Sequence, residues 1–184
     1  MNDQLIITPA AHQVDITRGL PKTGQTASYG LGDDGYFEAG WWQGRENANN
    51  RQRWIAKAIV GDDIVLDRAT GLMWAADGWA LGCNGGGVLS WNLAIIYCRG
   101  LNFAGFTDWR LPNVKELMSI VNYKLSNPAI DEPPFDTTAA LYYWSSTTYI
   151  LNTDDAWTAH FLAGGVDNRV KINTYYLRAV RDGL

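Results

Sequence analysis

Few residues of this chain have the types and spacing that catalysis or metal binding requires. The two histidines are His12 and His160, and the two cysteines are Cys83 and Cys98. Neither histidine has a second His or Cys at the short spacing that zinc sites use. The cysteines are compatible with a disulfide between a glycine-rich loop and a helix, or with two buried free thiols. The lack of an export signal favours the thiols.

Serine and carboxylate pairs are the other groups that could carry out chemistry. Ser145 and Ser146 follow a tryptophan in a predicted strand and lack the strained turn that exposes a catalytic serine, so we interpret both hydroxyls as hydrogen-bonding within a sheet. Adjacent aspartates lie at 33–34, 62–63 and 154–155. Neighbours on a strand point to opposite faces and seldom form a catalytic dyad. Turn carboxylates can bind calcium, but no calcium-loop motif is present. We therefore expect no enzymatic activity, cofactor or metal.

Composition and charge exclude several classes of partner. The 184 residues carry a net charge of -4 and no long block of Lys or Arg, so we expect no binding to nucleic acid. No apolar run approaches the roughly 18 residues of a membrane span, and residues 1–11 lack the basic segment of a signal peptide. The glycines of residues 82–87 are not followed by the Lys and Ser or Thr of a phosphate-binding loop, so we interpret them as a turn or lid.

Two helices are predicted in the middle of the chain. Ser90 can cap a helix that runs to about Leu101, with a buried stripe at spacings of three and four residues. That stripe is Trp91, Ala94, Cys98 and Leu101. Asn113 and Glu116 form a capping-box pattern at the start of a second helix. Its apolar face is Val114, Leu117, Met118 and Val121.

Short strands are predicted before and after these helices. They lie at residues 64–67, 71–75, 142–146, 156–161, 169–172 and 175–181. In the strand at 156–161, Trp157, Ala159 and Phe161 are expected to face the core. The alternate side chains, Thr158 and His160, are expected to face a ligand, a partner or solvent.

Three arginines close to the predicted elements, Arg110, Arg178 and Arg181, are expected to pair with acidic groups rather than to contact a ligand. Residues 1–60 are rich in Gly, Asn, Gln and Asp, which predicts an irregular N-terminal extension that packs on the domain or mediates assembly. The ligand-binding domain is predicted to span residues 61–184.

An ordered series of motifs carries a family resemblance. The motifs are Gly71-Leu-Met-Trp, Trp91 with Ala94 and Tyr97-Cys98, Asp108-Trp-Arg-Leu-Pro-Asn-Val-Lys-Glu-Leu, Tyr143-Trp-Ser-Ser-Thr, Ala156-Trp with Phe161, and Tyr176-Leu-Arg-Ala-Val-Arg. Over residues 64–181 this pattern resembles the Lcl C-terminal domain family, and more widely the C-type-lectin-like group. The resemblance implies an α+β, C-type-lectin-like fold with two helices and a mostly antiparallel, twisted C-terminal sheet.

The chain departs from the known chemistries of that wider group. The formylglycine-generating enzymes use cysteines in the C-terminal half, and this chain has none after Cys98. The related sulfoxide synthases need three histidines. Sugar-binding C-type lectins hold calcium with an acidic ligand before Pro-Asn, where this chain has Leu111. The resemblance therefore implies the scaffold without these chemistries.

Some members of this fold group are the variable proteins of diversity-generating retroelements, in which C-terminal loop and strand residues vary on a fixed scaffold. By that analogy the ligand-binding residues are Tyr149, Leu151, Asn152, Asp154, Thr158, His160, Asp167, Asn168, Asn173 and Tyr175. Tyr, Asn and Asp make adaptable contacts on a rigid frame.

Three functional hypotheses follow. The first is a non-catalytic receptor or adhesion module that binds a protein or carbohydrate on a cell surface. The second is a structural phage-tail or cell-surface component that oligomerises through residues 1–60, with a trimer implied by the relatives. The third is a scaffold-related enzyme with an unrecognised metal or thiol site. We favour the first and expect the protein to act at a cell surface or in a virion.

Overall fold

The computed structural model describes residues 23–36 and 53–183. Most of the predicted N-terminal extension, including His12 and the region proposed to mediate assembly, lies outside the described residues. The structure is α+β, with few helices and mostly antiparallel sheets, which confirms the coarse prediction of fold class.

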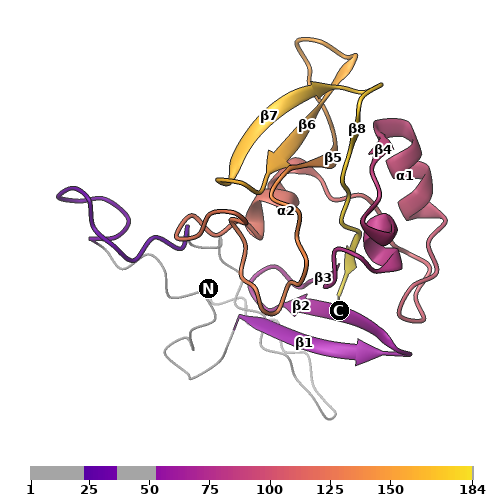
Figure 1. Ribbon diagram of the computed structural model, residues 1–184, viewed down its shortest axis with the longest axis horizontal. Coiled ribbons are helices and arrows are strands. Elements are labelled where there is room, and N and C mark those ends of the chain that lie inside the picture. The colour runs from indigo at the N-terminus through magenta and orange to yellow at the C-terminus, as the bar shows by residue number, and fades with distance from the viewer. Residues whose placement is uncertain (1–22, 37–52, 184) are drawn as a thin grey trace, which may run out of the picture.

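A four-stranded antiparallel sheet brings the two ends of the domain together. Its strands lie in the order β1 (Trp54–Ile59), β2 (Asp62–Asp67), β3 (Leu72–Ala75) and β9 (Val180–Asp182). The figure shows this sheet below the rest of the domain (Figure 1). Strand β1 pairs along its whole length with β2, so the prediction of irregular structure up to residue 60 is wrong for this segment.

The turn that joins β1 to β2 explains why the sequence did not reveal the hairpin. Val60 and Gly61 form its two-residue loop, and their φ angles are 55° and 87°. Two positive φ angles are the signature of the twisted turns that suit hairpins, and such turns usually carry Asn-Gly or Asp-Gly. A β-branched residue at this position is uncommon, so Val-Gly gave no turn signal.

A second set of strands carries the C-terminal region. Strands β5 (Tyr142–Thr148), β6 (Asp155–His160) and β7 (Gly165–Val170) form an antiparallel sheet, and β4 (Leu89–Ser90) pairs with β8 (Thr174–Tyr175). The backbone N–H of Tyr176 donates to Tyr142 O at 3.1 Å, which places β8 beside β5. Figure 1 shows β7, β6, β5, β8 and β4 across the upper part of the molecule.

The last predicted strand is divided between the two sheets. The sequence predicts one strand at 175–181, whereas β8 ends at Tyr175 and β9 begins at Val180. The chain between them crosses from one sheet to the other, and residues 177–179 of it are buried; Ala179, for example, donates its N–H to Gly82 O at 2.9 Å. A buried crossing and a buried strand have the same apolar composition, so the pattern could not distinguish them.

Both predicted helices are present, but only the second has its predicted cap, because the Ser90 side chain makes no capping hydrogen bond. Met118, predicted to lie on the apolar face of the second helix, is exposed. Helix α1 (Trp91–Arg99) follows Ser90, and helix α2 (Val114–Ser119) follows Asn113. The Asn113 side chain accepts a hydrogen bond from Glu116 N at 2.9 Å, and Glu116 Oε2 accepts from Asn113 N at 2.8 Å, which confirms the capping box. Residues 81–86 form a short 3-10 segment, η1 (Leu81–Gly86), in the glycine-rich region.

Two apolar clusters fill the domain. The first packs α1 against β2, β3 and one face of the β5–β6 pair, and includes Cys98, Trp109 and Trp144. The second packs α2 and residues 129–135 against the other face of that pair, and includes Trp74 and Phe161. Both faces of β5–β6 are therefore partly covered, which limits how much of this sheet can reach a ligand.

Both cysteines are free and buried, so the structure has the thiols rather than the disulfide. Burial raises the pKa of Cys98 to about 12, and burial also raises the pKa of Cys83. Each side chain belongs to the first apolar cluster. A buried thiol with a raised pKa stays protonated and behaves as a small apolar group.

Two of the three arginines pair with carboxylates as predicted. Arg110 contacts Glu116 at 2.7 Å and Asp182 at 3.1 Å, and Arg181 contacts Asp108 at 2.6 Å. These pairs tie the start of α2 and the segment before it to β9. They position the scaffold and do not present a free charge.

The prediction for Arg178 is wrong, because no carboxylate of the described residues contacts this fully buried guanidinium. It donates instead to neutral oxygens, at 2.6 Å to Ala75 O, 2.5 Å to Ala76 O and 2.8 Å to Thr138 Oγ1. Arg178 therefore links the end of β3 to the loop before β5.

Candidate functional site

The outer part of the β5–β6–β7 sheet carries a group of stacked rings and charges. The ring of Tyr142 lies 4.1 Å from the imidazole of His160, with the planes inclined by 12°. The guanidinium of Arg169 lies over the same tyrosine ring, 4.1 Å from its centroid, and also donates to the Tyr142 hydroxyl. Strand pairing causes this arrangement, because Tyr142 lies directly opposite His160 in the register.

Two further residues complete this group. Asp167 forms an ion pair with Arg169 at 2.8 Å. Tyr175 meets Tyr142 edge to face at 5.5 Å and Trp144 at 4.9 Å. We call Tyr142, His160, Asp167, Arg169 and Tyr175 the aromatic–cation cluster; all five are half-buried. Their rings are held by neighbours on one side and reach solvent on the other, which suits a pre-formed contact surface.

One end of the same sheet forms an exposed apolar tip. The loops at 149–154 and 171–173 meet there, because Lys171 donates through its backbone N–H to Asp154 O at 2.9 Å and through Nζ to Thr153 O at 2.8 Å. Ile150 and Leu151 are each 82% exposed, and Ile172 is 83% exposed. We call these three aliphatic residues the tip residues. Such side chains together on one loop pair are candidates for contact with a partner.

The ten ligand-binding residues predicted from the sequence lie in four different parts of the structure. His160, Asp167 and Tyr175 lie in the aromatic–cation cluster, and Leu151, Asn152, Asp154 and Asn173 are exposed in the loops of the tip. Sequence reasoning missed Tyr142, Arg169, Ile150 and Ile172. The cross-strand position of Tyr142 opposite His160 was the signal that could have found it.

Tyr149 and Asn168 belong to the other face of the sheet. The ring of Tyr149 meets Trp157 edge to face at 5.0 Å, and Trp157 pairs with Asn168 in the register of β6 and β7. Asn168 Nδ2 donates to Asp155 Oδ2 at 2.7 Å, while Asp155 Oδ1 has no hydrogen-bond partner. The predicted set therefore does not form one continuous surface.

Thr158 does not face outward as expected; its side chain is fully buried. It lies on the central strand of the sheet, opposite Trp144 on one side and Asp167 on the other. Its hydroxyl donates to Asp167 O at 2.9 Å. The larger neighbours on both flanking strands cover a threonine at this position, so alternation along one strand did not predict exposure.

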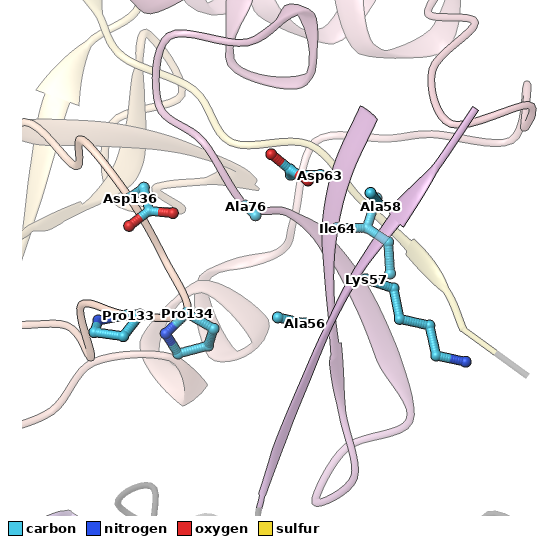
Figure 2. Close-up of a pocket in the computed structure, with 9 residues that line it drawn as sticks. All are labelled: Ala56, Lys57, Ala58, Asp63, Ile64, Ala76, Pro133, Pro134 and Asp136. Carbon is cyan, nitrogen blue, oxygen red and sulfur yellow. The ribbon is translucent and has the colours of Figure 1, made fainter. Parts of the chain in front are cut away.

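A separate hollow of about 320 Å³ lies between the β1–β2 hairpin and the loop at 133–136. Figure 2 shows the carboxylates of Asp63 and Asp136 on either side of Ala76, with the Lys57 side chain directed away from them. The other lining residues are Ala, Ile and Pro. The lining thus contains one amine and two carboxylates, and no hydroxyl, thiol or imidazole.

Comparison with protein families identifies the domain. Residues 63–181, well over half of the chain, match the model of the Lcl C-terminal domain. Comparison with curated proteins gives no significant match. Within residues 23–36 and 53–183, no helix has the length and apolar character to cross a membrane, and no group of three or more His, Cys, Asp or Glu could hold a metal ion. The chain belongs to the Lcl C-terminal domain family, as the order of its motifs predicted.

Proposed function

We propose that the protein is a non-catalytic ligand-binding module, acting as a receptor or adhesion domain for a protein or carbohydrate on a cell surface. The main observation behind the proposal is that one sheet bears both the aromatic–cation cluster and the exposed tip residues. Three aliphatic side chains more than four-fifths exposed lie at one end of the sheet that also carries the stacked rings of Tyr142 and His160.

The physical argument is one of pre-organisation. An exposed aliphatic side chain gains favourable free energy when a partner covers it. Rings that are fixed by stacking lose little conformational entropy on binding, so more of the contact free energy remains as affinity. Arg169 and Asp167 add charges that a polar ligand could contact, while their mutual ion pair holds them in place.

The C-type-lectin-like scaffold and the retroelement interpretation are parts of this proposal. Both rest on the motif resemblance. The exposure of Leu151, Asn152, Asp154 and Asn173 is compatible with a surface at which substitutions do not disturb the core. Sequencing the DNA around the gene tests the retroelement: a reverse transcriptase gene with an imperfect repeat of the C-terminal coding region supports it, and a locus without both contradicts it.

Binding to arrays of immobilised glycans and extracellular-matrix proteins tests the proposed function. The full chain is compared with a cluster variant, His160→Ala with Arg169→Ala. The control is Lys57→Ala, because Lys57 lies on β1, outside the proposed binding surface. We expect the wild type and the control to give the same signals and the cluster variant to lose at least about tenfold in affinity, which corresponds to about 1.4 kcal/mol. Unfolding curves establish that the variants are folded. A folded cluster variant with unchanged binding would contradict the proposal, as would the absence of any saturable signal for the wild type.

A further inference from the structure

A second pocket is lined by residues outside the aromatic–cation cluster and has a volume of about 350 Å³. It is lined by Gly78, Trp79, Gly86, Thr137, Thr138, Ala139, Tyr143 and Tyr176. Two loops and the start of β5 thus meet around it. The volume falls at the small end of the range for small-molecule sites, which suits a ligand of about one substituted ring.

Aromatic side chains form the walls of this pocket. Trp79 is 69% exposed, an unusual exposure for the largest apolar side chain. A Cβ atom at Gly86 would lie 3.0 Å from the indole ring, so the absence of a side chain at Gly86 lets the indole lie against the backbone. Tyr143 and Tyr176 stack at 5.4 Å with planes 28° apart. A ring-shaped ligand could therefore contact flat aromatic surfaces.

The walls are fixed before any ligand binds. Gly78 N donates to Asp136 O at 2.9 Å, and a Cβ at Gly78 would lie 2.3 Å from Thr137 O. Asp77 Oδ1 accepts from Trp79 N at 2.9 Å and also accepts from the Thr137 hydroxyl. The loop that carries Trp79 and the loop that carries Thr137 are thus held together, so ligand binding requires little ordering of either.

A buried positive charge lies behind one wall. Thr138 lines the pocket, and its hydroxyl accepts a hydrogen bond from Arg178 Nη2 at 2.8 Å. Arg178 is fully buried, it also donates to the backbone carbonyls of Ala75 and Ala76, and its Nε has no hydrogen-bond partner. Within the described part of the chain no carboxylate forms an ion pair with it. A buried cation without a counter-charge is costly, so a nearby anion gains favourable electrostatic energy in this low-dielectric surrounding.

From these observations we infer that the pocket between Trp79 and Thr138 binds a small ring compound that carries a carboxylate, either an aromatic acid or a sugar acid. The ring lies against the Trp79 indole and the half-buried ring of Tyr176, which Tyr143 supports from the buried side. The carboxylate lies toward Thr138, where the charge of Arg178 attracts it. This site is independent of the proposed cell-surface contact and does not require it.

Titration of the full chain with two acids and their neutral partners tests the inference. The probes are 4-hydroxybenzoate against 4-hydroxybenzamide, and glucuronate against glucose, followed by calorimetry or by NMR signals of the ligand. We expect one acid to bind saturably and its neutral partner to bind at least about tenfold more weakly, and the acid that binds identifies the ring type. Equal binding of acid and neutral compound, or no saturation by either acid up to about 10 mM, would overturn the inference.

Two variants that keep Arg178 itself test where the acid binds. Trp79→Ala removes the exposed ring, and Thr138→Val removes the hydroxyl that links the pocket to Arg178 with little change of shape. Each is expected to weaken acid binding at least about tenfold. Val60→Ser on the β1–β2 hairpin, where the side chain is 85% exposed, is the control and is expected to bind the acid as the wild type does. If Trp79→Ala and Thr138→Val remain folded and bind the acid unchanged, the acid binds elsewhere and the assignment is wrong.

Discussion

The ring of Tyr142 lies nearly parallel to the imidazole of His160, at 4.1 Å, and carries the guanidinium of Arg169 over it at a similar distance. One tyrosine therefore joins a residue of β6 to a residue of β7. This stack forms part of the surface that we propose for ligand binding, and it also contributes to the stability of the sheet.

Two replacements of Tyr142 distinguish the contribution of its ring to the free energy of unfolding from the contribution of its hydroxyl. Tyr142→Leu removes the stack and the cation–π contact, and we expect a loss of about 1–2 kcal/mol in the free energy of unfolding. Tyr142→Phe keeps both ring contacts and loses only the hydrogen bond from Arg169, so a loss of about 1 kcal/mol or less is expected. Urea denaturation of both variants gives the comparison. Equal losses would show that the rings contribute nothing beyond the hydroxyl.

The capping box of α2 gives a local prediction. Asn113→Ala removes the side-chain acceptor for Glu116 N and is expected to lower the free energy of unfolding by about 1 kcal/mol. Asn113→Asp retains an acceptor at the helix start and should lose much less. Both values come from the same denaturation measurement. A larger loss for Asp than for Ala would contradict the capping role.

Arg178 has a structural role that an arginine paired with an exposed carboxylate does not share. Arg178→Leu leaves the carbonyl oxygens of Ala75 and Ala76 without their donor, and we expect a loss of about 3 kcal/mol or more. Arg181→Leu is the matched control, because its partner Asp108 is 58% exposed and the pair should contribute about 1 kcal/mol or less. Thermal unfolding of both variants distinguishes these effects. Similar losses for the two would mean that the buried contacts of Arg178 add little.

Buried thiol and phenol groups predict how stability depends on pH. Burial raises the pKa of Cys98 from 9.0 to about 12 and the pKa of Tyr143 from 10.0 to about 12. The folded state holds these protons more tightly than the unfolded state does. Their contribution to stability is therefore complete below about pH 9 and is lost as the pH rises toward 12.

The urea midpoint of the wild type is accordingly expected to fall as the pH rises from about 9 to about 11. Cys98→Ala removes one of the titrating groups and should show a shallower fall over the same range. A midpoint that rises with pH, or an identical fall in the variant, would contradict the assignment of this effect to Cys98.

Local patterns predicted the helices well, because the signals lie within a few residues of each other. Asn113 and Glu116 are three residues apart, and the stripe on α1 repeats with the helical period. The hairpin at Val60 was missed because its backbone conformation is one that valine seldom adopts. The partners of Arg178 lie about a hundred residues earlier in the chain, so only the tertiary fold could identify them.

The sequence predicted only part of the candidate surface, because the rest depends on contacts between segments that are distant in the chain. Alternation along β6 placed His160 correctly on a partly exposed face but failed for Thr158, since exposure on a central strand depends on the neighbouring strands. Ile150 and Ile172 lie in loops that meet only because β6 pairs with β7. An apolar side chain in a loop gave no sequence signal that distinguished an exposed tip from a core contact.

Array binding by a tip variant tests the central claim most directly. The variant is Leu151→Ser with Ile172→Ser, and the control is Val60→Ser, an aliphatic residue that is 85% exposed on the β1–β2 hairpin. All three side chains are exposed, so the unfolding temperatures should stay close to that of the wild type. The account predicts that the tip variant loses at least about tenfold in affinity for the arrayed ligand while the control retains it. A folded tip variant that binds as tightly as the wild type would contradict the claim that this surface binds the ligand.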